Sequence, residues 1–553
     1  MPQLSVHAPL AVMWLTGGPV LLTTLQPVFM TVKGGSLVAR MSRARWRGVG
    51  GTLLGLLLFG VGILVAALLV RTYTLPSSQV SWQGPGVAEV KFTPDERQLL
   101  KRALIGALRI PTVSISVTEQ NVTALAELGA YIRRVFPSVF SSSIIKHEVV
   151  AEYSHLFAVQ GSDQSLKPYM ILAHLDVVPA PPEGWDVPPF SGEERDGYIY
   201  GRGALDNKCC VIGALQALDL LLKRGYKPKR SFYIGLGHDE EVSGHKGAMK
   251  VVEKLQSRGV KLLFVIDEGL AVMEGVLHGV KKSVALIGIT EKGSITLNLT
   301  VNQPTGHSSM PPAETSIGIL AAAVSRLEKN PMPNMFGEGP EALMFDHLAG
   351  EFAFPLNVMM ANLWLFSPII SRSLEQKPSS SAILRTTTAI TIFNAGVKEN
   401  VIPPMARATV NFRLHPAQTV DEVLDIVRNT INDERVDILV LNSFNPLPNS
   451  PHDDSNFGYQ TLKKTIHSVF TVTPVAPGIC IGNTDSRHFV NLTDSIYRFS
   501  PFKLKTEDLS RIHGLNERIS VEGLEQLTQF YYQLIQNADF DKVPVAHRAT
   551  HEL

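Results

Sequence analysis

The chain contains 553 residues, of which 45% are hydrophobic and 18% are charged. This length exceeds what one hydrophobic core normally organises, so the sequence predicts two domains with additional segments. The 51 Lys and Arg residues almost balance the 50 Asp and Glu residues. A nucleic-acid-binding protein is therefore not expected, because such proteins carry an excess of positive charge on one face.

The first predicted element is an uncharged stretch at residues 48–70, rich in Leu, Val and Gly. It is long enough to span a bilayer, and the arginines just before it predict a cytoplasmic N-terminal side. The alternative is a secretory signal that begins near Met41, although no clear small-residue cleavage motif follows. Both interpretations send the bulk of the chain into the secretory pathway, as a secreted protein or as a membrane-anchored one with an extracellular or lumenal domain. Residues 8–32 form another apolar stretch, which is either a second hydrophobic segment or an upstream extension with little role.

Sequons and cysteines add only modest information about the compartment. Three Asn-x-Ser/Thr sequons, at Asn121, Asn298 and Asn491, fit a glycosylated secretory protein. The three cysteines do not form a disulfide framework, and we expect them to be small buried apolar residues: Cys209, Cys210 and Cys480.

The order of predicted segments gives the domain organisation. Residues 1–71 form an N-terminal extension, residues 72–92 a linker rich in Ser, Pro and Gly, and residues 541–553 a tail. A helix start at Thr93, followed by Pro and two acids, opens the globular part. We predict a catalytic domain at residues 93–290 and 446–540, interrupted by an inserted domain at residues 291–445.

Strands and helices alternate in the first of these domains. Apolar strands are predicted at residues 168–173, 231–236 and 261–266, with helices at residues 211–223 and 247–258. This alternation indicates an α/β fold with a mostly parallel sheet, in which functional side chains gather at the carboxyl ends of the strands.

Polar residues follow each of these strands. Taken singly, each is more often a satisfied core residue, a helix cap or a solvated turn. Together they supply the nitrogen and oxygen ligands that zinc accepts, and one carboxylate shared by two ions would give a two-metal site. The candidate groups are His174 and Asp176, Asp206, Asp239 to Glu241, Asp267 with Glu268, and His513.

Five motifs carry a resemblance to a known family: His174-x-Asp176, Gly203-x-x-Asp206-x-Lys208, Asp239-Glu240-Glu241, Asp267 and His513-x-x-Asn516-Glu517. Over about residues 95–540 they resemble the signature of the aminoacylase and glutamate-carboxypeptidase family of dizinc amidohydrolases. The resemblance implies that Asp206 bridges two Zn²⁺ ions and precedes a cis peptide bond. His174 and Asp267 would complete one zinc site, and Glu241 and His513 the other.

The resemblance also implies roles for two acids beside the ligands. Asp176 would orient His174 or the catalytic glutamate. Glu240 would be the general base that takes a proton from the attacking water and passes it to the leaving nitrogen.

The inserted domain, residues 291–445, has the segment order β-α-β-β-α-β. Strands are predicted at residues 294–301, 386–393 and 407–414, and helices at residues 316–328 and 419–431. This order suggests a ferredoxin-like lid, which the family also has. By resemblance, His307 stabilises the tetrahedral oxyanion, sometimes across a homodimer formed through the lid. Without the resemblance, His307 would be an exposed loop residue.

Three residues match positions that contact substrate in the family. Asn400 and Arg413 lie in the lid, and a structural salt bridge is an equally good interpretation of Arg413. Arg487 matches the arginine that holds the amino-acid carboxylate, a task that suits a bidentate guanidinium.

Residues 330–385 are longer than a compact lid requires and contain two apolar runs. They either form a groove for a fatty acyl chain or pack the core of the lid itself, and the sequence favours neither.

The resemblance implies an extracellular zinc enzyme that hydrolyses N-acyl amino acids with long chains. It also implies the reverse condensation of fatty acids and free amino acids. A dipeptidase or carboxypeptidase with the same metal site is the alternative. A non-catalytic carrier of lipidated amino acids is disfavoured, because no ligand or base is missing.

Overall fold

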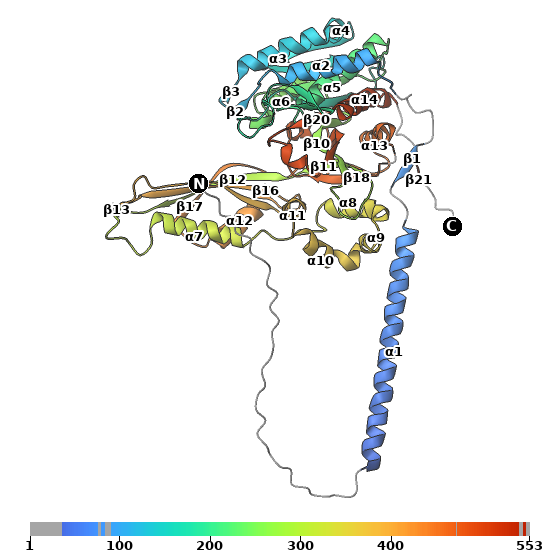
Figure 1. Ribbon diagram of the computed structural model, residues 1–553, viewed down its shortest axis with the longest axis vertical. Helices are drawn as coiled ribbons and strands as arrows, with labels where there is room; N and C mark the ends of the chain where they lie inside the picture. The colour runs from blue at the N-terminus through green and yellow to red at the C-terminus, as the bar shows by residue number, and fades with distance from the viewer. Residues whose placement is uncertain (1–35, 76–78, 83–89, 472, 541–545, 549–553) are drawn as a thin grey trace, which may run out of the picture. The chain divides into compact units, whose positions relative to one another are not determined.

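A computed structural model of the chain describes residues 36–75, 79–82, 90–471, 473–540 and 546–548 (Figure 1). The apolar stretch at residues 8–32 lies outside these. The chain divides into two compact units, Met1–Ala67 and Leu68–Leu553. The predicted catalytic and lid segments both belong to the second unit.

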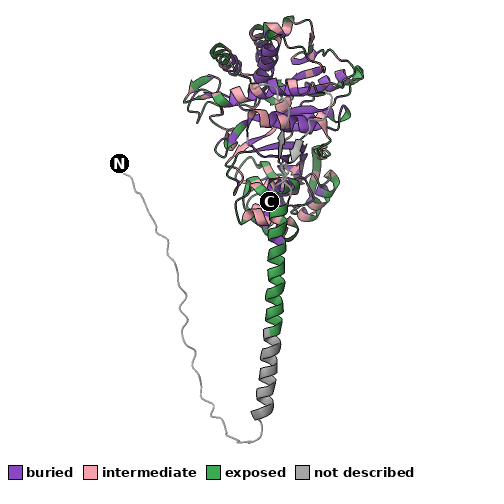
Figure 2. Cartoon of the chain, turned by 90° about the vertical axis from the view of Figure 1, so that its right-hand side faces the viewer, coloured by how far each residue is buried: buried purple, intermediate pink, exposed green. Residues whose placement is uncertain are grey.

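The apolar stretch at residues 48–70 lies within helix α1 (Ser36–Thr74). Its portion Thr52–Thr74 has a mean hydropathy of 2.9 and is long and apolar enough to cross a membrane. Its side chains are mostly exposed, as the green stretch of the helix in Figure 2 shows. A helix of this composition has no polar face to present to water.

The largest sheet has eight strands in the order β18-β11-β19-β10-β6-β9-β5-β4. Neighbours from β19 through β10 and β6 to β9 are parallel, as are β11 and β18, whereas β4, β5 and the β11–β19 contact are antiparallel. The α/β class is therefore confirmed, with a mixed sheet whose centre is parallel. The strands are β4 (Ile145–Val150), β5 (Ser154–Val159), β6 (Tyr169–His174), β9 (Phe232–Gly237), β10 (Val265–Glu274), β11 (Val284–Glu291), β18 (Val475–Cys480) and β19 (Ile496–Lys505).

Helices cover both faces of this sheet, so its strands are apolar on both sides. In β6, Ile171 and Ala173 join the core formed with helices on one face, whereas Met170 and Leu172 point to the other face. The first face is covered by α2 (Pro94–Leu108), α3 (Val122–Val135), α5 (Lys208–Lys223), α13 (Phe457–Val469) and α14 (Val521–Asn537); the second is covered by α6 (Ala248–Ser257) and the short helix η3 (Asp485–Asn491). The three cysteines are buried and free.

The lid has its own antiparallel sheet in the order β14-β16-β12-β17, with α7 and α12 packed against it. Alternate residues of β12 and β16 are buried beneath the two helices, which forms a second core. The segment order is the one predicted for a ferredoxin-like unit. The elements are β12 (Gly293–Asn302), α7 (Ser316–Lys329), β14 (Thr387–Ala395), β16 (Met405–Leu414), α12 (Val420–Ile431) and β17 (Val436–Phe444).

Met332 joins the core of the lid, but most of residues 330–385, which we call the insertion, packs elsewhere. Met344, Phe345 and Leu348 of the insertion form one apolar cluster with Leu286 and Ala476 of the large sheet. Packing within the lid, one of the two interpretations of this segment, therefore applies only to its start. The helices of the insertion are α8 (Glu341–Leu348), α9 (Leu356–Ala361), α10 (Leu363–Leu374) and α11 (Pro378–Leu384).

Candidate metal centre

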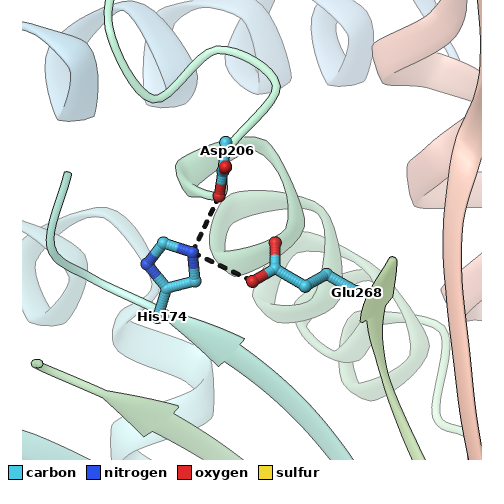
Figure 3. Close-up of side chains that lie close together, drawn as sticks. All are labelled: His174, Asp206 and Glu268. Carbon is cyan, nitrogen blue, oxygen red and sulfur yellow. Dashed lines mark hydrogen bonds and ion pairs between the residues drawn. The ribbon is translucent and has the colours of Figure 1, made fainter. Parts of the chain in front are cut away.

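One group of possible metal ligands lies at the carboxyl end of the parallel strands. His174 ends β6, Asp206 precedes α5, and Glu268 lies in β10. His174 Nε2 lies 2.9 Å from Asp206 Oδ1 and 3.1 Å from Glu268 Oε1, and the three side chains point toward one another (Figure 3). The parallel pairing of β6 and β10 brings His174 and Glu268 together, and the loop before α5 adds Asp206.

A second group shares Asp206 with the first. His513 Nε2 lies 3.1 Å from Asp206 Oδ2 and 3.1 Å from Glu241 Oε2. Asp206 thus offers one oxygen to each histidine. The His513 side chain is 51% exposed and that of His174 only 1%, so the site opens toward solvent beside His513. We call His174, Asp206, Glu241, Glu268 and His513 together the candidate metal centre.

The structure brings Glu268, and not the predicted Asp267, into this centre. Asp267 accepts hydrogen bonds from the backbone N–H groups of Ser486 and Glu268 instead, at 2.8 and 2.9 Å. The reason is local, because β10 continues beyond the predicted strand at residues 261–266 and includes both acids. Adjacent residues of a strand point to opposite faces, so only one of the two acids can face the centre. An irregularity between Asp267 and Leu270 marks the same place in the β10–β19 pairing.

A buried carboxylate fixes the loop that carries Asp206. Glu517 accepts from Arg202 Nη1 at 2.7 Å and from the backbone N–H groups of Gly203, Leu205 and Asp206. The Asp206–Asn207 peptide bond is cis, as the resemblance implies. The sequence places Glu517 four residues after His513 in the same motif, but this position alone does not indicate its structural role.

The predicted positioning acid and general base adjoin the centre. Asp176 lies 3.4 Å from His174 Nδ1 and accepts from the backbone N–H groups of Glu240 and Glu241, at 3.1 and 3.3 Å. One carboxylate therefore contacts both a member of the centre and the backbone of the candidate base. Glu240 begins the short helix η1 (Glu240–Val242), directly before Glu241 of the centre.

Burial and crowding shift the ionisation of these groups in the metal-free protein. Burial raises the pKa of Glu241 to about 7, and Asp206 adds to the effect. Burial likewise raises the pKa of Glu268 to about 7, with His174 opposing and Asp206 adding. Burial disfavours the charged form of His174, yet Glu268, Asp176 and Asp206 together raise its pKa well above the usual value. Asp206 and Glu241 raise the pKa of His513 to about 10.

The donor set fits divalent cations. Two imidazoles and three carboxylates match zinc, and a shared carboxylate is typical of two-metal sites. Glu241 Oε1 is buried and has no hydrogen-bond partner among the described residues, although a buried carboxylate oxygen normally has one. Burial and neighbouring carboxylates raise the pKa values of Glu241 and Glu268, and bound cations would favour the charged forms of both.

Two predicted substrate-binding arginines approach the centre from different domains. Arg487 donates to the carbonyl of Ser243 at 2.6 Å, and its guanidinium lies 5.4 Å from the ring of Phe444. It lines a cavity of about 270 Å³ at the boundary between the lid and the catalytic domain. Burial lowers the pKa of Arg413, with Arg487 adding and Glu240 opposing, and Arg413 is hydrogen-bonded to Asn483. The two guanidinium groups are therefore close enough to influence each other, and Arg413 is also close enough to influence Glu240.

His307 and Asn400 are grouped with each other instead. Strand β13 (Gly306–His307) pairs with β15 (Val401–Ile402), and Ser308 N–H donates to the Asn400 carbonyl at 3.2 Å. The His307 side chain is exposed, and its Nδ1 accepts from Ser309 N–H at 3.1 Å. In Figure 1, β13 lies at the end of the lid opposite α8 to α10. Their predicted roles in catalysis and substrate binding stay predictions.

Comparison with known proteins identifies the family. Residues 170–537 match the family described as Peptidase family M20/M25/M40. The chain belongs to this family. Its resemblance to dizinc amidohydrolases is thereby confirmed at the family level, and the match covers the whole candidate metal centre.

Curated relatives extend over most of the chain. It is 69% identical over 513 residues to the N-fatty-acyl-amino acid synthase/hydrolase PM20D1 of Xenopus tropicalis, covering 93% of this chain and 100% of the relative. The Homo sapiens protein of that name is 58% identical over 458 residues, covering 83% and 91%. A probable carboxypeptidase S-like 2 of Dictyostelium discoideum is 40% identical over 490 residues, covering 87% and 93%.

Solved structures share the fold at low identity. An M20 family metallo-carboxypeptidase from Sulfolobus solfataricus superposes with a TM-score of 0.58 at 18% identity, covering 80% of this chain and 99% of its own. Human carnosine dipeptidase 1 gives a TM-score of 0.57 at 17% identity, covering 81% and 100%.

Proposed function

We propose that this protein is a zinc-dependent amidohydrolase that cleaves N-fatty-acyl amino acids and also forms them from fatty acid and amino acid. The observation that carries the proposal is the pair of ligand groups that share Asp206, with Glu240 beside them. The substrate class is supported by the similarity to the PM20D1 proteins.

The metal ligands are proposed from the geometry. His174, Asp206 and Glu268 would hold one Zn²⁺, and Asp206, Glu241 and His513 a second. When bound, the two ions would polarise the amide carbonyl and lower the pKa of water. Asp176 would fix the orientation of His174 and the position of the Glu240 backbone at the same time.

Glu240 is the proposed proton carrier. Burial raises its pKa well above the usual value; Glu268 and Asp485 add to the effect, and His174 opposes it. A carboxylate with a raised pKa accepts a proton more readily near neutral pH, so Glu240 would take a proton from water and deliver it to the leaving nitrogen. In synthesis the same carboxylate would carry the proton in the opposite direction, because both directions share one transition state.

The carboxylate of the amino acid is assigned to Arg487. Its guanidinium faces a cavity and uses one Nη for Ser243, which leaves donors for a carboxylate. Arg413 would contribute positive charge from the lid. Asn400 and His307 would reach the substrate only from another position of the lid or from a second copy of the chain.

We also propose a homodimer through the lid, because a second copy of the chain could bring His307 and Asn400 to the substrate. The edge strands β14 and β17 expose apolar side chains, and exposed edges readily pair with another chain. These residues are Ile392, Phe393, Leu439 and Leu441. Sedimentation of the purified protein would test the dimer, and a monomer at all concentrations would exclude a contribution of His307 from a partner.

We also propose that the chain enters the secretory pathway and that helix α1 directs it there. The support is the apolar portion Thr52–Thr74, which acts either as a signal or as an anchor. Expression in cultured cells, followed by fractionation and N-terminal sequencing, would separate the secreted form from the anchored form. A protein found only in the cytosol would contradict export.

The substrate class is tested by release of amino acid from N-oleoyl-leucine and from a Leu-Leu dipeptide. The protein would be assayed with zinc and after chelation. We expect chelator-sensitive cleavage of the oleoyl compound at a higher kcat/KM than the dipeptide. Cleavage of the dipeptide alone would replace the proposal with a dipeptidase.

A further inference from the structure

An apolar cavity of about 260 Å³ lies between the insertion and the large sheet. Its lining is mostly Leu, Ile, Met and Phe, and the methionines are adaptable in shape. The wall from the sheet includes Leu270, Leu286 and Ile479, and the wall from the insertion includes Met344, Phe345 and Met360.

Segments that line this cavity continue directly into the candidate metal centre. Leu270 follows Glu268 by two residues on β10, and Leu509 precedes His513 by four. Ile481, also in the lining, is followed by Asn483, which is hydrogen-bonded to Arg413. Three lining residues therefore lie only two to four positions along the chain from members of the centre or from the partner of Arg413.

The insertion is anchored beside the same site. Lys292 Nζ donates to the carbonyls of Ala382 and Arg385 at 2.7 Å, and the Lys292 carbonyl accepts from Asn483. Helix α11 is thereby tied to the start of the lid sheet. The lining residues Lys377, just before α11, and Ser379 of α11 are exposed, so the cavity also reaches solvent there.

We propose that this cavity binds the hydrocarbon chain of the acyl group, with the carboxyl carbon at the metal centre and the far end of the chain among α8, α9 and α11. This assignment rests on the proposed function and adds to it the residues that select long chains. Arg487 and the cavity would then recognise opposite ends of the substrate, one charged and one apolar.

The test narrows the cavity with bulky side chains and varies the length of the acyl chain of the substrate. Met344→Trp and Ile383→Trp fill it from two helices, and Leu343→Trp is the matched control because Leu343 is 36% exposed and lies outside the lining. We expect kcat/KM for N-oleoyl-leucine to fall by at least tenfold in both cavity variants, since each buried methylene contributes about a fourfold factor. Turnover of N-acetyl-leucine by the cavity variants should change by less than twofold. Turnover of both substrates by the control variant should also change by less than twofold.

The outcomes separate the two proposals. If the wild-type protein cleaves N-acetyl-leucine but not N-oleoyl-leucine, the proposed function is wrong. If it cleaves both and the two Trp variants retain oleoyl turnover, the cavity assignment alone is wrong. A third measurement needs no variant: an N-acyl-leucine with a diazirine at the chain end should label residues 341–384 on illumination, and labelling confined to other segments would also overturn the assignment.

Discussion

Two groups of histidine in this protein show opposite electrostatics. In the candidate metal centre, carboxylates surround His174 and raise its pKa. At β4 and β5, His147 Nε2 and His155 Nδ1 are 2.9 Å apart, and the two rings stack near Phe157. Burial lowers the pKa of His155 to about 3 and that of His147 to about 4, with Arg133 adding to both. Buried histidine therefore marks a cation site only where carboxylates converge on it.

The largest expected effect concerns the base beside the first cluster. Glu240→Gln should lower kcat by roughly 10²–10⁴-fold, because it removes general acid–base catalysis while preserving the shape of the side chain. Steady-state kinetics and zinc content would be measured together, and zinc content should not change. Glu253→Gln, at an exposed position on α6, is the control. A small change in kcat for Glu240→Gln would remove Glu240 from the mechanism.

The next effect concerns the support of the centre. Glu517→Gln leaves the buried Arg202 without a charged partner, and breaking a buried ion pair typically costs about 3–5 kcal/mol. We expect a lower free energy of unfolding in urea. Glu522→Gln, at an exposed position on the same chain segment, should be nearly neutral. Equal stability of the two variants would show that Glu517 does not hold the loop of Asp206.

The smallest effect concerns the second cluster. His147 and His155 are neutral in the folded protein down to about pH 4 and about pH 3, whereas the unfolded chain gains protons below pH 6.5. Stability present above pH 6.5 should therefore be lost as the pH falls toward 4, by about 2–3 kcal/mol for His155. Urea midpoints across this range would measure it.

In His155→Gln this acid-dependent loss should shrink, whereas exposed His245→Gln should leave it unchanged. An unchanged pH profile in His155→Gln would contradict the assignment of a neutral buried histidine.

The difference between the two groups of histidine also explains which site residues could be predicted from the sequence. His174, Asp206, Glu241 and His513 were predictable because each follows a strand or lies in a motif, and carboxyl ends of parallel strands converge. Glu268 was missed because the choice between two adjacent acids depends on which face each takes, and β10 continues through an irregularity that no local pattern reveals. His147 and His155 carry no such signal, since their environment is set by tertiary packing.

The lid and the insertion also differ in how much of each could be predicted from the sequence. Periodicity predicted three of the four strands and both helices of the described lid sheet within a few residues, because each buries a regular face. The helices of the insertion pack against the large sheet rather than the lid, and this depends on contacts between segments distant in the sequence. His307 was expected at the oxyanion and is exposed on strand β13 of the lid, so its role stays a prediction.

The central claim is that two cations share Asp206 and that Glu268 is one of their ligands. Elemental analysis of zinc per chain in the wild type, Glu268→Gln and Asp267→Asn tests it most directly. We predict two zinc ions in the wild type and in Asp267→Asn, and one in Glu268→Gln. Two ions retained in Glu268→Gln, with one lost in Asp267→Asn, would contradict the account.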